Sequence, residues 1–232
     1  MLDKEIIKYK FQKSIATYAD NAPIQLQIAK KLASYIEGTY DNILEIGSYS
    51  GFLTREINNK INFKNYYALD LVDSYEYIKN INPKIKFIIG DIEQIELKDK
   101  YDLIMSSSSL QWCENLGMVI KKLKSYLRPQ GHLIVAIFGK QNLYQIKETF
   151  GISLNYPNIS EIKNLFSQNA KIFEETKTLQ FNNPKEILRH LKYTGVNSLK
   201  NNVKYSEIKE KMKILDEKYE NKLTYNPLYI ID

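Results

Sequence analysis

Three acidic residues, Glu45, Asp70 and Asp91, each come at or near the end of an apolar run that is typical of a buried strand. Carboxylate oxygens accept hydrogen bonds from hydroxyl, amine and ammonium groups. Gly47 and Gly51 follow the first run, and glycine lets a backbone come close to a ligand. The carboxyl ends of parallel strands meet at one edge of a sheet, where α/β proteins bind ligands. We therefore expect the three acids to surround one nucleoside-like molecule.

The loop after Glu45 excludes two common phosphate-binding motifs. The dinucleotide fingerprint requires glycines at its first, third and sixth positions, which here are Gly47, Tyr49 and Phe52. A P-loop requires a Gly-Lys pair, and no lysine follows Gly51. The remaining pattern, E-x-G-x-x-x-G, resembles motif I of the class I S-adenosylmethionine-dependent methyltransferases. That family usually has a third glycine where this chain has Tyr49, so we expect the tyrosine side chain to turn outward, away from the donor.

This resemblance implies S-adenosylmethionine as the methyl donor. Asp70 would accept hydrogen bonds from both ribose hydroxyls. Asp91 would lie near the adenine amine, with Leu71 and Ile92 on the two sides of the ring. An ordinary turn aspartate is the alternative for Asp70. The complete set of residues expected around the donor is Glu45, Gly47, Ser48, Gly51, Asp70, Leu71, Asp91, Ile92 and Ser107.

Length, composition and charge are those of a folded protein of modest basicity. The chain has 232 residues, of which 44% are apolar, enough for a sizeable core. Its net charge of +6 indicates either a solvated surface or an acidic partner. The single cysteine, Cys113, excludes an internal disulfide and fits a reducing compartment. Because the sequence shows neither a signal peptide nor a membrane-spanning run, we expect a cytoplasmic protein that does not enter a membrane. Its acids and histidines do not have the spacing of metal ligands, so no metal is expected.

The segment after the fourth expected strand, residues 106–109, argues against nucleic acid as the substrate. All four residues are serine, whereas base-amine methyltransferases carry an Asn/Asp-Pro-Pro-aromatic clamp there. Base C5-methyltransferases need a reactive cysteine after a proline, but Cys113 follows Trp112.

Alternating strands and amphipathic helices predict an α/β protein with a parallel sheet and right-handed crossovers. Together with the resemblance, this implies a Rossmann-like class I methyltransferase fold. Such a fold is a mostly parallel seven-stranded sheet flanked by helices, with N-terminal helices and a helical insertion capping the site. We also expect one long strand over residues 171–181. The predicted organisation is a single domain over 1–232, with N-terminal helices or a lid (1–40), a donor-binding core (41–140), a substrate cap with late sheet elements (141–222) and a terminal strand (223–232).

Stretches spread over nearly the whole chain resemble one family more closely, the malonyl-[acyl-carrier protein] O-methyltransferases of biotin synthesis. Residues 110–112, Leu-Gln-Trp, and 191–197, Leu-Lys-Tyr-Thr-Gly-Val-Asn, are more specific to it than the donor motifs. Ser107 departs from this family, which usually has asparagine there. The resemblance implies malonyl-acyl carrier protein or malonyl-coenzyme A as the substrate, and the acidic carrier protein as a partner. The complete set of similar stretches is 11–18, motif I, 110–114, 127–131, 137–139, 188–197 and 223–229.

The reaction that this family catalyses needs no general base. A carboxylate is ionised at neutral pH, and a sulfonium methyl group is already electrophilic. Catalysis then consists of positioning and exclusion of water. We expect Tyr18 and Arg189 to do the positioning, with Arg189 neutralising the malonyl carboxylate. The other residues expected around the substrate are Gln111, Trp112, Phe138, His190 and Lys192.

Several alternatives stay open from the residues alone. Tyr18 could be a core or rim aromatic, and the basic trio at 189, 190 and 192 could be a solvated surface. A different small carboxylic acid, such as an aconitate-like one, would need the same chemistry. A catalytically silent methyltransferase-like protein would result if the Tyr49 side chain filled the donor site.

Overall fold

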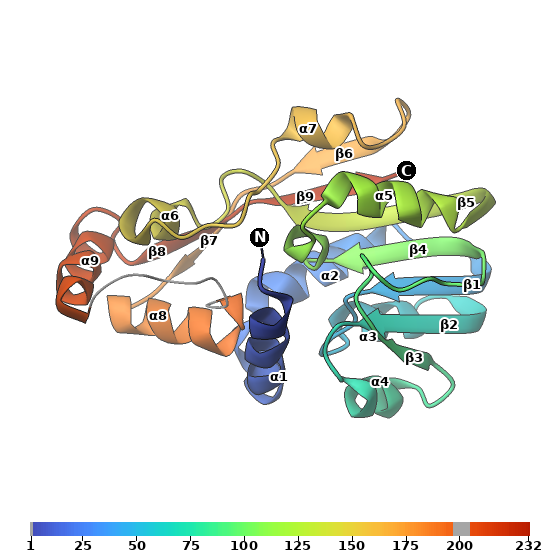
Figure 1. The fold of residues 1–232 in the computed structure, drawn as a ribbon, viewed down its shortest axis with the longest axis horizontal. Coiled ribbons are helices and arrows are strands. Elements are labelled where there is room, and N and C mark those ends of the chain that lie inside the picture. Colours follow the sequence, from blue (N-terminus) through green and yellow to red (C-terminus); the bar gives the residue numbers. More distant parts are fainter. Residues whose placement is uncertain (1, 197–204) are drawn as a thin grey trace.

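The apolar runs of the sequence pair with one another in the computed structural model, which describes residues 2–196 and 205–232. Seven strands form one sheet in the order β3-β2-β1-β4-β5-β9-β6 (Figure 1). Neighbours among β1 to β5 are parallel, and β9 is antiparallel to both β5 and β6. The mostly parallel seven-stranded sheet is therefore confirmed. Its strands are β1 (Thr39–Ile46), β2 (Asn62–Asp70), β3 (Lys86–Ile89), β4 (Tyr101–Ser107), β5 (Leu127–Phe138), β6 (Lys171–Glu174) and β9 (Pro227–Ile231).

Helices flank the sheet, and several late elements form a lobe beyond its carboxyl edge (Figure 1). That lobe contains a two-stranded sheet of β7 (Lys177–Gln180) and β8 (Lys222–Tyr225). The helices are α1 (Lys4–Asn21), α2 (Pro23–Ser34), α3 (Phe52–Asn58), α4 (Tyr75–Ile81), α5 (Leu116–Ser125), α6 (Tyr144–Phe150), α7 (Ile159–Lys163), α8 (Pro184–Tyr193) and α9 (Tyr205–Glu217), with one 3-10 turn at Leu110–Trp112. Within the described ranges, none of them combines the length and apolarity needed to span a membrane.

Side chains of the central strands alternate between two apolar clusters, because successive residues of a strand point to opposite faces. Ile43 of β1 packs in the cluster that contains the apolar residues of α2 and α3. Its neighbour Leu44 packs in the other cluster, with the apolar residues of α5. Leu103 and Ile104 of β4 divide in the same way. Burial on both faces fixes the sheet, and with it the residues at its carboxyl edge.

The two N-terminal helices begin where the sequence supplies start signals. The Asp3 side chain accepts a hydrogen bond from the Ile6 N–H, and Pro23 lies in the first turn of α2. In Figure 1, α1 lies next to α8, past the carboxyl ends of the strands. The Thr17 hydroxyl of α1 donates to the Tyr193 carbonyl oxygen of α8 at 3.4 Å. Both helices therefore stand at the edge where a ligand is expected.

Two stretches expected to be single strands are each divided between the two sheets. Residues 171–181 contain β6 and β7, and the terminal stretch from 223 to 231 contains parts of β8 and β9, so the single long strands are wrong. Asn226 lies at the second break. Its side chain accepts from the Gln141 N–H at 3.1 Å and donates to the Glu175 carbonyl oxygen at 3.0 Å. These contacts join distant segments, and an alternating pattern does not reveal them.

Candidate active site

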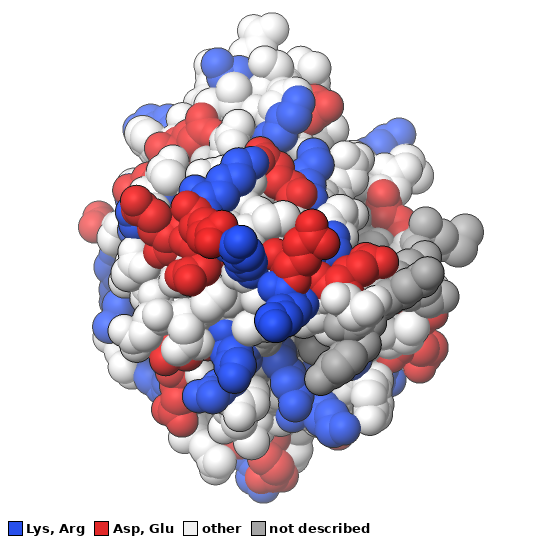
Figure 2. Space-filling view, turned by 90° about the vertical axis from the view of Figure 1, so that its left-hand side faces the viewer, with Lys and Arg blue, Asp and Glu red and all other residues white. Residues whose placement is uncertain are grey.

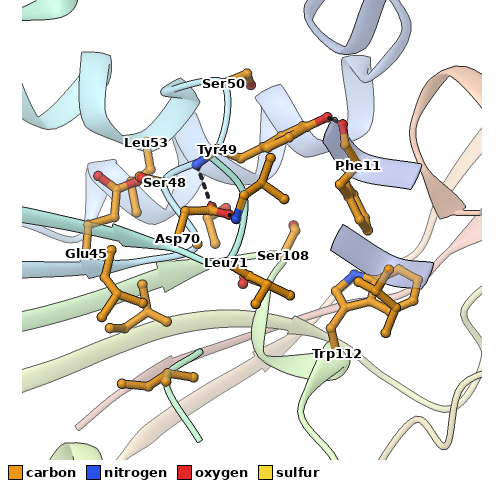
Figure 3. A pocket seen from close by; sticks show the side chains of 18 of the residues that line it. Phe11, Glu45, Ser48, Tyr49, Ser50, Leu53, Asp70, Leu71, Ser108 and Trp112 are labelled. Carbon is orange, nitrogen blue, oxygen red and sulfur yellow. Dashed lines mark hydrogen bonds between the residues drawn. The ribbon is translucent and has the colours of Figure 1, made fainter. Parts of the chain in front are cut away.

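A cavity opens at the carboxyl ends of β1, β2 and β4, where parallel α/β sheets bind their ligands (Figure 3). Eight of the nine residues expected around the donor line it: Glu45, Gly47, Ser48, Asp70, Leu71, Asp91, Ile92 and Ser107. We call it the first cavity. The strand ends thus bring together side chains that are far apart in the sequence.

Gly51 is the exception, because it does not line the first cavity. It precedes α3 with φ +78°, and a Cβ there would lie 2.3 Å from the Ile81 side chain of α4. This glycine therefore permits the turn and the packing of two helices. Gly47 has φ +75°, and its Cβ would lie 2.1 Å from the Ser109 hydroxyl oxygen, so glycine is needed there too.

Glu45 is buried at the end of β1, where its Oε2 accepts hydrogen bonds from Thr54 and Tyr66. Burial raises the pKa of its carboxyl group to about 7, although these two bonds favour the ionised form. Both bonds end on the same oxygen. A cationic group in the cavity would stabilise the carboxylate of Glu45 and be bound by it.

Asp70 is held at the end of β2 by backbone donors. The Tyr49 N–H donates to Oδ2 and the Val72 N–H to Oδ1, each at 2.8 Å (Figure 3). Burial nevertheless raises the pKa of this carboxyl group to about 6. Each oxygen keeps a further lone pair for a ligand, so the side chain can accept from two neighbouring hydroxyls.

Asp91 stands where α1 reaches the first cavity. The Lys4 ammonium lies 3.5 Å from Asp91 and 2.6 Å from Glu93, and it donates to the Trp112 carbonyl oxygen at 3.0 Å. Lys4 itself lines the cavity. The start of α1 is therefore fixed to this end of the site by charge.

We expected the Tyr49 side chain to turn outward, but it is not exposed to solvent. Its side chain is only 8% exposed and extends toward α1, where the hydroxyl donates to the Phe11 carbonyl oxygen at 2.7 Å (Figure 3). The hydroxyl also lies 3.1 Å from the Ser14 hydroxyl, and the ring packs edge-on against Tyr18. The side chain thus leaves the space in front of Asp70 open and connects the loop to α1.

A second cavity adjoins the first one. Five residues line both cavities: Phe11, Tyr18, Gln25, Ser108 and Trp112. The second cavity is otherwise lined by Gln111, Phe138, Asn142, Leu143, Leu154, Tyr156, Thr194, Val196 and Tyr225. Two molecules that occupied the two cavities would meet at the shared residues.

The structure separates the residues expected around the substrate. Tyr18, Gln111, Trp112 and Phe138 line the second cavity. Arg189, His190 and Lys192 line neither cavity, so the expected salt bridge between Arg189 and a carboxylate inside the site is not supported.

The geometry of α8 explains this correction, since successive residues of a helix point about 100° apart. Arg189 and Lys192 are exposed. His190 is buried instead, with its Nε2 2.5 Å from the Tyr225 hydroxyl, and burial lowers the pKa of its ring to about 4. It is therefore neutral at pH 7 and is not a third cation. Asn197, the last residue of the family-like stretch on this side, lies outside the described residues.

Sequence reasoning missed Gln25 and Ser108. Gln25 lies on the apolar face of α2 with Ile28, Ala29 and Leu32, and a polar residue at such a position was the available signal. Ser108 has φ +55°, a conformation that non-glycine residues rarely adopt and that the sequence does not reveal.

Comparison with known proteins agrees with this architecture. The family model Methyltransf_11, a methyltransferase domain, matches residues 44–135. The solved structure of YcgJ from Bacillus subtilis covers 89% of this chain and 96% of its own length, with a TM-score of 0.64 at 12% identity. The DhpI–SAM–HEP complex covers 74% of this chain and 91% of its own, with a TM-score of 0.56 at 13% identity. At such identities these structures show a common fold.

Curated relatives are more similar in sequence. The malonyl-[acyl-carrier protein] O-methyltransferase of Calditerrivibrio nitroreducens is 34% identical, over 97% of this chain and 94% of its own length. The enzyme of the same name from Acinetobacter baylyi is 30% identical, over 99% and 96%. The chain therefore belongs to the malonyl-[acyl-carrier protein] O-methyltransferase family.

Proposed function

We propose that this protein transfers the methyl group of S-adenosylmethionine to the free carboxylate of a malonyl thioester, malonyl-acyl carrier protein, at the start of biotin synthesis. The observation that carries the proposal is the pair of adjoining cavities with five residues in common. A donor in the first cavity and an acceptor in the second can meet at that shared wall, which is what direct methyl transfer requires.

The donor occupies the first cavity in this proposal. Glu45 receives its ammonium group, with the backbone around Gly47 and Ser48 beside its amino-acid part. Asp70 accepts from the two ribose hydroxyls. Asp91 lies near the adenine amine, and the apolar Leu71 and Ile92 contact the ring. Ser107 lines the same space.

Methyl transfer itself is a single displacement. A carboxylate oxygen forms a bond to the methyl carbon, the carbon–sulfur bond breaks, and its electron pair stays on sulfur. The products are a methyl ester and S-adenosylhomocysteine, and no proton is transferred. Tyr18 and Trp112, which line both cavities, close the reacting centre from water.

The carrier protein docks outside the cavities. Arg189 and Lys192 are exposed on α8, while Thr194 and Val196, just beyond the end of that helix, line the second cavity. Figure 2 shows the face that carries α8 and α9, on which Lys and Arg side chains gather below the centre and a band of Asp and Glu lies above them. Exposed cations on the helix that leads into the wall of the second cavity suit an acidic protein that inserts a thioester arm.

A product measurement tests this function. The protein is incubated with S-adenosylmethionine and, separately, with malonyl-acyl carrier protein, malonyl-coenzyme A and free aconitate, and each product is analysed by mass spectrometry. We expect one added methyl group on the malonyl thioesters. Methylation of free aconitate alone would assign the chain to a different small acid. Failure to bind S-adenosylmethionine in calorimetry would indicate a catalytically silent protein.

A further inference from the structure

Several buried polar atoms around the two cavities have no hydrogen-bond partner within the described residues. They are Gln25 Oε1, Ser48 Oγ, Ser108 Oγ and Gln111 Oε1. Buried polar groups are nearly always hydrogen-bonded in native proteins, so a group left without a partner calls for an explanation. A serine hydroxyl can donate to an acidic ligand, whereas an amide oxygen only accepts. A half-turn of the Gln25 amide about its last bond brings its NH2 group to the place of the unpartnered oxygen, so Gln25 can also donate to a ligand there.

Gln25 and Ser108 stand apart within this set, because they line both cavities. The Gln25 side chain is only 6% exposed, although it belongs to the apolar face of α2. Ser108 keeps its left-handed backbone while its N–H donates to the Ala136 carbonyl oxygen at 2.8 Å. A strained backbone and an unpartnered hydroxyl coincide at one residue, a combination typical of functional sites.

The second cavity contains no Lys or Arg among its described lining residues. The polar groups of these residues are amides, hydroxyls, phenols and the Trp112 indole. The donors that the described wall offers to an acidic substrate are therefore neutral. We propose that Gln25, through its amide NH2 group, and Ser108, through its hydroxyl, seat the methyl-accepting carboxylate by neutral hydrogen bonds at the wall shared by the two cavities. This assignment rests on the proposed function and replaces Arg189 as the carboxylate seat.

Neutral hydrogen-bond donors suit a reaction in which both reacting groups lose their charge. The carboxylate and the sulfonium are oppositely charged before transfer, and the ester and thioether are neutral afterwards. A protein cation on the reacting carboxylate would stabilise the reactants more than the transition state and would slow the reaction. Amide and hydroxyl donors also orient the carboxylate oxygen. Their interaction with it weakens less than that of a cation would as the oxygen loses its charge, and the sulfonium already supplies the opposite charge.

The same arrangement selects the class of acceptor. Burial raises the pKa of the Tyr156 hydroxyl, in the wall of the second cavity, to about 12, so this phenol is protonated at neutral pH. Neither a carboxylate nor a neutral histidine ring stands among the described residues of that wall to act as a base. An alcohol or an ammonium group would have to lose a proton there, whereas a carboxylic acid arrives ionised.

The test compares Gln25→Met, Gln25→Glu and Ser108→Ala with wild type and with Gln27→Met, a matched control on the exposed side of the same helix. Donor affinity comes from calorimetry and kcat/KM from methylation of the malonyl thioester. A hydrogen bond to a charged group corresponds to a roughly 10- to 100-fold loss of kcat/KM. We expect Gln25→Met and Ser108→Ala to lose that much, with donor affinity changed less than threefold and Gln27→Met unchanged.

Gln25→Glu provides a pH-dependent readout, which would not change if Gln25 had only a structural role. An ionised glutamate would repel the acceptor, so its kcat/KM relative to wild type should rise as the pH falls from 8.5 to 6. A flat ratio, or Gln25→Met and Ser108→Ala with wild-type kcat/KM, overturns the proposal. Wild-type turnover reports separately on the proposed function. If another carboxylic acid is the substrate, the same variants are compared on that acid. If no carboxylic acid is methylated, the proposal that Gln25 and Ser108 bind the carboxylate is refuted together with the proposed function.

Discussion

Asp70 is the residue whose ionisation we expect to govern donor affinity. Burial raises the pKa of its carboxyl group to about 6, against the influence of its backbone hydrogen bonds. Ribose hydroxyls bond more strongly to a carboxylate than to the neutral acid. As the pH falls through 6, the free protein takes up a proton at Asp70 that the donor must displace. We expect Asp70 by itself to raise the Kd for S-adenosylmethionine, measured by calorimetry, up to about tenfold per pH unit below that value.

Two variants assign this pH dependence to its source. Asp70→Asn should weaken donor binding at least roughly tenfold at pH 8 and remove the titration near pH 6, because it loses charged-acceptor bonds. Glu45→Gln should keep that titration and remove a second one near pH 7, since burial raises the pKa of Glu45 to about 7. Wild-type donor affinity that is constant between pH 8 and pH 5 would contradict the role of both carboxylates.

The sequence predicted the positions of these acids well and those of the expected substrate residues only in part, for a physical reason. Glu45, Asp70 and Asp91 end parallel strands, and parallel strands bring their carboxyl ends to one edge whatever the details of packing. The role of Gly51 depends instead on where α4 packs. The role of Arg189 depends on the side of α8 on which this residue lies. Directions of this kind are set by contacts between distant segments, which residue types alone do not specify.

Among the structural elements, the Tyr49 side chain joins the loop before α3 to helix α1. The E-x-G-x-x-x-G pattern identified the strand, the loop and α3 in order, and these are present. The pattern did not indicate that α1 would supply the partners of the tyrosine, since 38 residues separate Tyr49 from Phe11. The divided strands have the same origin, because Asn226 contacts segments that are remote in sequence.

We predict that Tyr49 holds α1 in place without taking part in donor binding. Tyr49→Gly relieves a backbone held at φ +38° and removes the hydroxyl bonds and the ring contacts with Phe11 and Tyr18. Donor affinity should stay within about threefold of wild type or improve, because the side chain leaves the space before Asp70 open. Cleavage of α1 by trypsin should become faster by roughly 100-fold, the equivalent of about 2.7 kcal/mol.

Tyr49→Phe is the matched control for this helix. It keeps the ring contacts but loses the bonds to Phe11 and Ser14, each worth about 1 kcal/mol. An intermediate cleavage rate is therefore expected. Loss of donor binding in Tyr49→Gly, with α1 still resistant to trypsin, would mean that the tyrosine serves the donor instead of the helix.

At the scale of the whole molecule, the two contacts that we propose, with the reacting carboxylate and with the carrier protein, lie in different places. Neutral groups line the second cavity, and the cations Arg189 and Lys192 stand on the outside of α8. A net charge of +6 indicated an acidic partner only loosely, because lysines are scattered over the sequence. The fold places α8 beside α1 (Figure 1). Thr194 and Val196, which follow α8 directly, line the second cavity. We therefore predict that these exposed cations contact the carrier protein and do not contact the reacting carboxylate.

The double variant Arg189→Glu/Lys192→Glu tests this separation. Its KM for malonyl-acyl carrier protein should rise at least roughly tenfold at low salt, because like charges now face an acidic partner. Its KM for malonyl-pantetheine, which has the thioester but no carrier protein, should stay within twofold. The matched control Lys84→Glu/Lys98→Glu changes the net charge equally at exposed positions preceding β3 and β4, at the opposite edge of the sheet. Since the Debye length shortens to about 3 Å at 1 M salt, the difference between the two double variants should largely vanish there. An equal rise in KM for both substrates would indicate that Arg189 contacts the malonyl carboxylate after all. An equal rise in KM in the control pair would indicate that the carrier protein binds elsewhere.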